Sequence, residues 1–295
     1  MEWKILLYAR RKEPLDIPDD LSKYPMNDFE LDYWRIVNSA PFRRLQDKTQ
    51  VFPLDKSDFV RTRLTHSMET SALAKQLATM ITANIRKNKS GTPYAMTEDE
   101  ARDAANAVMC AGLLHDIGKL KIPTELLNKP GKYTDEEFAQ VRLHTQYGYE
   151  LLKPLPLDAH IKLAALSHHE RCDGTGYPNG LTTNDIDPYA RVVAIADVYD
   201  AMTTARSYRA PLCAFQVIAN FERDGLQKYD TKCVLAFLNR IAGTYQNHRI
   251  LLSDGRSANI VMLNDKQLSR PIVQLDDGSC IDLSTAGDLH IQAVL

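Results

Sequence analysis

The sequence predicts a mainly α-helical protein that ends in a small β-rich appendage, and three observations support this prediction. First, apolar residues recur at helical spacings in several long segments. Second, two segments open with a Thr-x-x-Glu pattern, in which each side chain satisfies a backbone amide at a helix start. Third, the chain changes after residue 245 to short β-rich runs around Asp-Gly pairs, which is a hairpin signal. We therefore expect a helical domain over residues 1–245 and a β appendage over 246–295.

The N-terminal third carries two helical signals. The segment "NDFELDYWRIVNSAPFRRLQ" starts with Asn27 as a candidate N-cap, and Pro41 is expected to interrupt the helix. In "RTRLTHSMETSALAKQLATMITANIRK" the apolar residues recur mostly at spacings of three to five, which predicts a helix with one buried stripe. That stripe comprises Leu64, Met68, Leu73, Leu77, Met80, Ile81 and Ile85. His66 lies beside the stripe, so we expect it to face the interior or its margin.

The middle of the chain predicts further helices, several of which carry histidines. The capping box at Thr97 opens a helix that runs through "AVMCAGLL" to the pair 115–116, and the capping box at Thr134 opens the helix that bears His144. "LDAHIKLAALSHHE" and "PYARVVAIADVYDAMTTARSYR" are also helical in character. The segment 173–180, "DGTGYPNG", holds three glycines and a proline, so we expect a loop. Two more helices are expected before the appendage.

Composition excludes several classes of protein. A hydrophobic content of 44% allows a full core, and 36 Lys and Arg against 38 Asp and Glu leave no basic field for duplex nucleic acid. The five cysteines are odd in number and widely spaced, which argues against a disulfide framework and favours a cytoplasmic location. No segment approaches the ~20 apolar residues that a membrane-spanning helix needs, so we expect no membrane insertion.

A set of histidines and aspartates predicts a metal site. It comprises His66, His115, Asp116, His144, His168, His169 and Asp197. Each histidine alone could be an ordinary core or surface residue. Burying an aspartate after a mostly apolar run, however, costs several kcal/mol unless it is paired, and a divalent cation is a partner that also explains the histidines. A carboxylate can bridge two ions, so Asp116 is the expected bridge, whereas His160, His248 and His290 are expected to be structural.

The same segments resemble a known family. "LLHDIGKLKIP", "HTQYGYELL", "HHERCDGTGYPNGL", "ARVVAIADVYDAM" and "ARSYR" are similar to motifs of the HD-GYP phosphodiesterases, which belong to the HD metal-dependent phosphohydrolases. The resemblance runs from about residue 110 to 210 and implies an HD-type helical bundle around a metal centre. It also implies hydrolysis of a cyclic dinucleotide, chiefly cyclic di-GMP. The tail from "YQNHRILLSDGRSANIV" onward resembles the C-terminal extension often found on these proteins.

The resemblance implies roles for individual residues. One metal would be held by His66, His115, Asp116 and Asp197, and a second by Asp116, His144, His168 and His169. Asp200 is the alternative to Asp197 as a metal ligand. The family pattern favours Asp197 as the ligand and Asp200 as a residue that orients a ligand. Asp116 and Lys119 would be catalytic; Lys119, Arg206 and Arg209 would bind phosphate, and Gly174, Gly176, Tyr177 and Pro178 would line the substrate edge.

Two departures from the family pattern leave alternatives open. Thr62 stands where three-metal members carry glutamate, so we expect two divalent ions, and the His-rich ligand set suits iron or manganese. The segment 42–71 resembles deoxyguanosine triphosphate triphosphohydrolases of the same superfamily, which makes that activity the runner-up. A catalytically silent receptor for a cyclic dinucleotide is a third alternative. The sequence leaves the oligomeric state, including a homodimer, open.

Overall fold

The computed structural model describes residues 28–47, 62–92, 95–204 and 211–295. Asn27, the expected first N-cap, lies outside these residues. The described chain forms two compact units, the first ending at Asp200 and the second starting at Ala201. The domain boundary expected at residues 245 and 246 stays a prediction. None of the helices in the described residues is both long and apolar enough to cross a bilayer.

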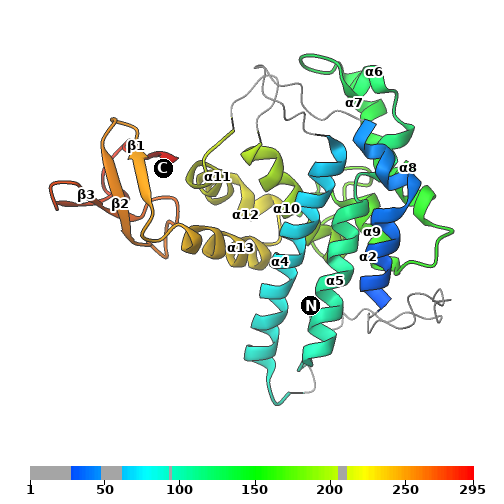
Figure 1. The fold of residues 1–295 in the computed structure, drawn as a ribbon, viewed down its shortest axis with the longest axis horizontal. Helices are drawn as coiled ribbons and strands as arrows, with labels where there is room; N and C mark the ends of the chain where they lie inside the picture. Colours follow the sequence, from blue (N-terminus) through cyan, green and yellow to red (C-terminus); the bar gives the residue numbers. More distant parts are fainter. Residues whose placement is uncertain (1–27, 48–61, 93–94, 205–210) are drawn as a thin grey trace. The chain divides into compact units, whose positions relative to one another are not determined.

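The first unit is helical, as predicted (Figure 1). Its α-helices are α2 (Asp28–Asn38), α3 (Ala40–Arg43), α4 (Arg63–Lys89), α5 (Glu98–Leu114), α6 (Thr124–Leu127), α7 (Asp135–Arg142), α8 (His144–Leu152), α9 (Ala159–Ser167) and α10 (Pro188–Thr203), whose last residues belong to the second unit. Two short 3-10 segments, η1 (Arg44–Asp47) and η2 (Ile117–Lys121), complete it.

The predicted capping boxes are confirmed at the starts of α5 and α7. Thr97 and Thr134 each accept a hydrogen bond from the backbone amide three residues on, and the glutamates reciprocate. Such a cap stabilises a helix by about 1 kcal/mol. A third capping box, unpredicted, opens α4, where the side chain of Thr62 accepts from the amide of Thr65. Thr62 therefore has a structural role as the N-cap of α4.

The buried face of α4 differs from the predicted apolar stripe. Leu77 and Ile81 are buried, but Met68 is 43% exposed, so the stripe is wrong at its N-terminal end. The true buried face there consists of small and polar residues: His66, Ser67, Thr70, Ser71 and Ala74. Small side chains let α4 lie against α5 (Figure 1), and a Cβ on Gly112 would come within 2.8 Å of the Ser71 Cα. This close contact sets His66 opposite the C-terminal end of α5.

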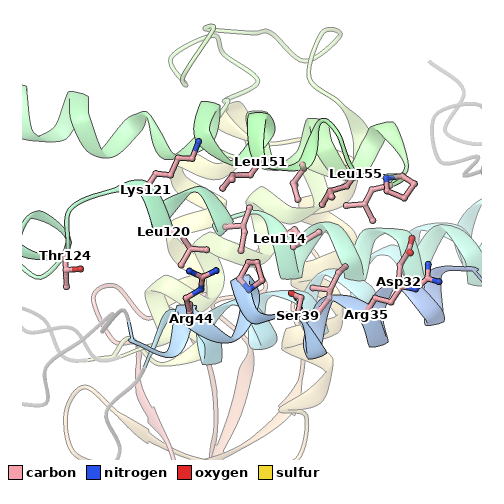
Figure 2. A pocket seen from close by; sticks show the side chains of 16 residues that line it. Asp32, Arg35, Ser39, Arg44, Leu114, Leu120, Lys121, Thr124, Leu151 and Leu155 are labelled. Carbon is pink, nitrogen blue, oxygen red and sulfur yellow. Dashed lines mark hydrogen bonds between the residues drawn. The ribbon is translucent and has the colours of Figure 1, made fainter. Parts of the chain in front are cut away.

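A cavity of about 850 Å³ lies between the α2–α3 segment and the η2–α8 segment (Figure 2). Its walls are mostly apolar, with Leu120, Leu151 and Leu155 among the side chains that point into it. Leu114 and Ile117, which flank the pair His115–Asp116, also line it. None of the predicted metal ligands lines this cavity, so it is separate from the histidine set.

The second unit contains the predicted β appendage together with three helices. The elements are α11 (Ala214–Asn220), the π-helical turn η3 (Phe221–Gly225), α12 (Leu226–Lys228), α13 (Thr231–Thr244), β1 (Arg249–Leu252), β2 (Ser257–Met262), β3 (Ile272–Leu275), β4 (Cys280–Asp282) and β5 (Ile291–Val294). The strands pair antiparallel in the order β4-β3-β2-β1-β5. Gly255 and Gly278 adopt positive φ in the two hairpin turns, which confirms the Asp-Gly signal. Strand β5, which pairs with β1, was not predicted.

His160 ties α9 to the start of α10. Its Nδ1 lies 2.6 Å from the Asp187 carboxylate, and its ring centroid lies 4.8 Å from that of Tyr189. This hydrogen bond raises the pKa of His160 above 6.5, against the opposing effect of burial. The residue therefore has a structural role outside the histidine set, as expected.

The raised pKa predicts a pH-dependent contribution to stability. A raised folded-state pKa means that the contact stabilises the protein fully below pH 6.5 and that this stabilisation is lost as the pH rises through the folded value. We expect His160→Gln to lower the free energy of unfolding most near about pH 6 and least at alkaline pH, as measured by urea denaturation. The exposed His248, changed to Gln, is the control. A loss that does not vary with pH would contradict the assignment.

Candidate metal centre

Five elements of the first unit bring the predicted ligands to one place. His66 projects from α4, and His115 and Asp116 follow α5. His144 begins α8, the pair 168–169 follows α9, and Asp197 lies on α10. All are buried except His169, which is half-buried. Most of these side chains stand at helix ends, where short turns aim them at a common centre.

Asp116 lies between two groups of histidines. Its Oδ1 is 3.4 Å from the Nε2 of His144 and 3.7 Å from the Nε2 of His168. Its Oδ2 is 3.6 Å from the Nε2 of His115 and 3.9 Å from the Nε2 of His66. Two groups of ligand atoms could each hold an ion, one from Asp116 with His144, His168 and His169, the other from Asp116 with His66 and His115. Asp116 is the member common to both groups.

Asp197 and Asp200 lie on different sides of the His66 ring. The Oδ1 of Asp197 is 3.1 Å from Nε2 of His66 and 3.9 Å from Nε2 of His115. The Oδ2 of Asp200 is 2.5 Å from Nδ1 of His66. Asp197 is therefore on the side where a metal would bind, and Asp200 can orient the ring from the other side. The assignment of Asp197 as a ligand stays a prediction.

Backbone carbonyls fix the orientation of three imidazoles. The Nδ1 of His115 is 2.7 Å from the Gly112 carbonyl oxygen, and the Nδ1 of His144 is 2.6 Å from that of Val141. The Nδ1 of His168 is 3.1 Å from the carbonyl oxygens of both Ala164 and Ala165. An Nδ1–H that donates to a carbonyl leaves the Nε2 lone pair for a metal.

The protonation states of the site suit a cation. Burial lowers the pKa of His115 to about 4 and that of His144 to about 3, so both rings are neutral at pH 7. Burial alone would raise the pKa of Asp116, but the charge of Lys119 and the contacts with its histidines outweigh burial and hold that pKa well below its usual range. His66 differs, because hydrogen bonds to Asp197 and Asp200 outweigh burial and raise its pKa. The centre thus offers mostly neutral imidazoles and ionised carboxylates.

Unpartnered buried atoms show that the residues fit a metal. The Oδ1 of Asp116 and the Nε2 of His115 are buried and have no hydrogen-bond partner. The Nε2 atoms of His144 and His168 lie 3.4 Å apart, although both would present lone pairs. Buried polar atoms without partners cost free energy, and facing lone pairs repel. A divalent cation between them would supply the missing interactions.

Of the three basic side chains predicted to bind phosphate, the structure describes only Lys119. The Nζ of Lys119 forms an ion pair with the Oδ2 of Asp116, so this lysine reaches the centre. Burial lowers the pKa of Lys119, and the Asp116 carboxylate opposes that effect. Arg206 and Arg209 lie outside the described residues, and their predicted contact with phosphate stays a prediction.

The glycine-rich loop packs against the histidines. The ring of Tyr177 stacks on that of His169, with centroids 4.7 Å apart and an interplanar angle of 30°. Gly174 adopts φ +79°, and a Cβ on Gly176 would lie 2.3 Å from the Arg171 amide nitrogen, so both positions require glycine for backbone reasons. Pro178 follows Tyr177 through a cis peptide bond. The substrate contacts expected of these four residues stay predictions.

Sequence reasoning missed Glu170, which holds this loop. Glu170 is 2% exposed, and its carboxylate accepts hydrogen bonds from the backbone amides of Asn179 and Leu181 at 2.7 and 2.9 Å. An acidic residue between two histidines and a glycine-rich loop is a signal that could have indicated this role. Glu170 therefore positions the loop that carries Tyr177.

Comparison with known proteins identifies the family. A sequence profile described as "HD domain" matches residues 65–233, more than half of the chain. The chain belongs to the HD domain family. This family match confirms the helical bundle expected around the histidine and aspartate set.

Relatives of this HD domain carry two kinds of names. The chain is 49% identical over 118 residues to a deoxyguanosinetriphosphate triphosphohydrolase-like protein of Listeria innocua, matching 40% of this chain and 25% of that protein. It is 39% identical over 167 residues to a cyclic di-GMP phosphodiesterase of Pseudomonas aeruginosa, covering 56% of this chain and 40% of the relative. It is 43% identical over 120 residues to a 3'3'-cGAMP-specific phosphodiesterase of Vibrio cholerae, and this match covers 40% of this chain and 22% of the relative. The chain thus spans at most 40% of the length of these relatives.

Gly118 offers a sharp test of the geometry around Asp116. A Cβ on Gly118 would lie 1.9 Å from the His144 carbonyl oxygen, whereas a Cβ on the facing Gly148 would meet nothing closer than 3.5 Å. We expect Gly118→Ala to lower the free energy of unfolding by about 3 kcal/mol and to reduce bound metal, because the turn must move away from α8. The matched control Gly148→Ala should retain metal and change stability by about 1 kcal/mol or less. Denaturation and metal analysis would check this, and equal effects of both variants would contradict it.

Proposed function

We propose that this HD domain is a metal-dependent phosphohydrolase that opens a cyclic dinucleotide, most readily cyclic di-GMP or a mixed ring. The observation that carries the proposal is the position of Asp116, whose two oxygens face separate groups of histidines. One carboxylate between two such groups is the arrangement that a pair of bridged ions requires. The complete ligand set, with none of its members replaced, favours an enzyme over a catalytically silent receptor.

Two divalent cations, with iron or manganese the preferred metals, would be held by the seven predicted ligands. When bound, they would polarise the phosphate and lower the pKa of an attacking water. Hydrolysis forms a P–O bond to that water, and the P–O bond to one ribose oxygen breaks while that oxygen takes up a proton. The product of the first step is a linear dinucleotide.

Lys119 is proposed to stabilise the charge that develops on the phosphate. It is largely buried and bears its positive charge directly beside Asp116. A fixed cation in such a water-poor site stabilises a developing anion more than one in solvent does, because screening is weaker. Arg206 and Arg209 are proposed to add positive charge at the same phosphate.

The loop that carries Tyr177 supports a cyclic dinucleotide over a nucleoside triphosphate. The Tyr177 ring stacks on a predicted ligand, His169, so the loop borders the metal centre and offers an aromatic wall. The relatives named as cyclic di-GMP and cGAMP phosphodiesterases favour the same substrate class. The second candidate is dGTP triphosphohydrolase activity, which the name of the Listeria innocua relative favours.

A substrate panel tests the proposal directly. The purified chain, loaded with manganese or ferrous iron, should open cyclic di-GMP or a mixed cyclic dinucleotide faster than it releases triphosphate from dGTP. Chromatography of the nucleotides would measure both rates, with a chelator-treated sample as the control. Faster cleavage of dGTP than of any cyclic dinucleotide would favour the second candidate.

A further inference from the structure

Arg142, the last residue of α7, is held by two aromatic rings. Its guanidinium carbon lies 4.4 Å from the ring centroid of Phe138 and 4.9 Å from that of Tyr177. Both distances are within the range of a cation–π interaction. The two rings also contact each other edge to face, with centroids 6.2 Å apart. The guanidinium is therefore restrained although the residue is exposed.

This guanidinium has no acidic partner among the residues that the structure describes. Nearby Lys129 pairs with Glu137, and the surface residue Arg102 pairs with Asp99. Within the described part of the chain, the Arg142 guanidinium instead makes cation–π contacts with two aromatic rings. A cation–π contact does not use the N–H groups as donors to a carboxylate, so the planar fork of donors stays available for another acceptor.

The position of Arg142 relates it to the metal centre. Tyr177, which contacts Arg142, stacks on His169 and lies 6.5 Å from the ring of His144, centroid to centroid. One aromatic side chain therefore separates the guanidinium from two predicted metal ligands. A cyclic dinucleotide carries two phosphates and two bases, so a ligand with one phosphate at the metal centre needs a second binding site for its other half.

We propose that Arg142, held by cation–π contacts with Phe138 and Tyr177, forms a subsite that binds a pair of adjacent acceptors on the non-reacting half of the substrate. This inference rests on the proposed cyclic dinucleotide activity. A planar fork of donors fits the O6 and N7 of guanine, and it fits two oxygens of the second phosphate equally well. Arg142 is then a residue that selects and orients substrate, and it takes no part in the chemical step.

Steady-state kinetics of the manganese-loaded chain test this subsite. Arg142→Ala should raise KM for cyclic di-GMP roughly 10- to 100-fold, the range for losing one bidentate pair, while kcat changes far less. Arg142→Lys should not restore KM, because an ammonium cannot supply two coplanar donors. Phe138→Ala should raise KM by a smaller factor, since one supporting ring remains. Arg102→Ala is the matched control on a surface cation and should leave both constants unchanged.

A comparison of ligands distinguishes the two sources of acceptors. Each ligand is tested as a substrate or competitive inhibitor. If Arg142→Ala weakens the binding of cyclic di-GMP but not that of cyclic di-AMP, the subsite binds guanine. If the variant binds both ligands equally more weakly, the subsite binds the second phosphate. Bis(p-nitrophenyl) phosphate lacks both groups, so the same variant should lose far less activity toward it.

Several results would overturn the inference. They are an unchanged KM in Arg142→Ala, full recovery in Arg142→Lys, no effect of Phe138→Ala, or an equal loss with bis(p-nitrophenyl) phosphate. A wild-type chain that neither binds nor hydrolyses any cyclic dinucleotide would instead refute the proposed function, and this subsite with it. The behaviour of the wild type thus separates the two failures.

Discussion

A buried carboxylate between two groups of imidazoles is the constraint on which the first unit depends. Asp116 is 1% exposed, and its Oδ1 has no hydrogen-bond partner. An ionised group in such a place is expensive unless positive charge compensates it. Lys119 supplies one positive charge at Oδ2. The lone pairs of the surrounding histidine nitrogens could bind cations that supply further positive charge. The stability of the core and its proposed chemistry are therefore coupled through one side chain.

Close backbone contacts bring the ligands to this carboxylate. Gly112 lets α5 lie against Ser71 of α4, and Gly118 lets the turn after Asp116 lie against the start of α8. Side chains larger than hydrogen at these two positions would push ligand-bearing elements apart. The helix ends then direct three of the imidazoles, those of His115, His144 and His168, because carbonyls of the preceding turn accept the Nδ1–H. The close packing of these helices and the placement of the metal ligands thus both depend on Gly112 and Gly118.

Much of this arrangement could be predicted from local sequence signals. Capping boxes at Thr97 and Thr134 and the Asp-Gly turns depend only on neighbours in sequence, so their predictions were confirmed. The buried face of α4 was misjudged, because apolarity marks a core face poorly where close helix packing selects small polar residues such as Ser67 and Ser71. Strand β5 depends on pairing with β1, about 40 residues earlier in the chain, which no local pattern reveals.

The same distinction applies to the candidate site. The histidines and aspartates were recognisable as a set because their residue types share one chemistry. The contact of Arg142 with Phe138 and Tyr177 was not recognisable from the sequence, because the spacing of one exposed arginine and two aromatic residues matches no known pattern. Only the fold shows that these three side chains meet beside His169.

The most direct test of the account is the metal content of wild type and Asp116→Asn, combined with electron paramagnetic resonance of the manganese-loaded proteins. The amide keeps the shape of the carboxylate but cannot carry the bridging negative charge. The account predicts two equivalents of manganese with the spectrum of a magnetically coupled pair in the wild type, and at most one uncoupled ion in the variant. A variant that retains two coupled ions would contradict the central role of Asp116.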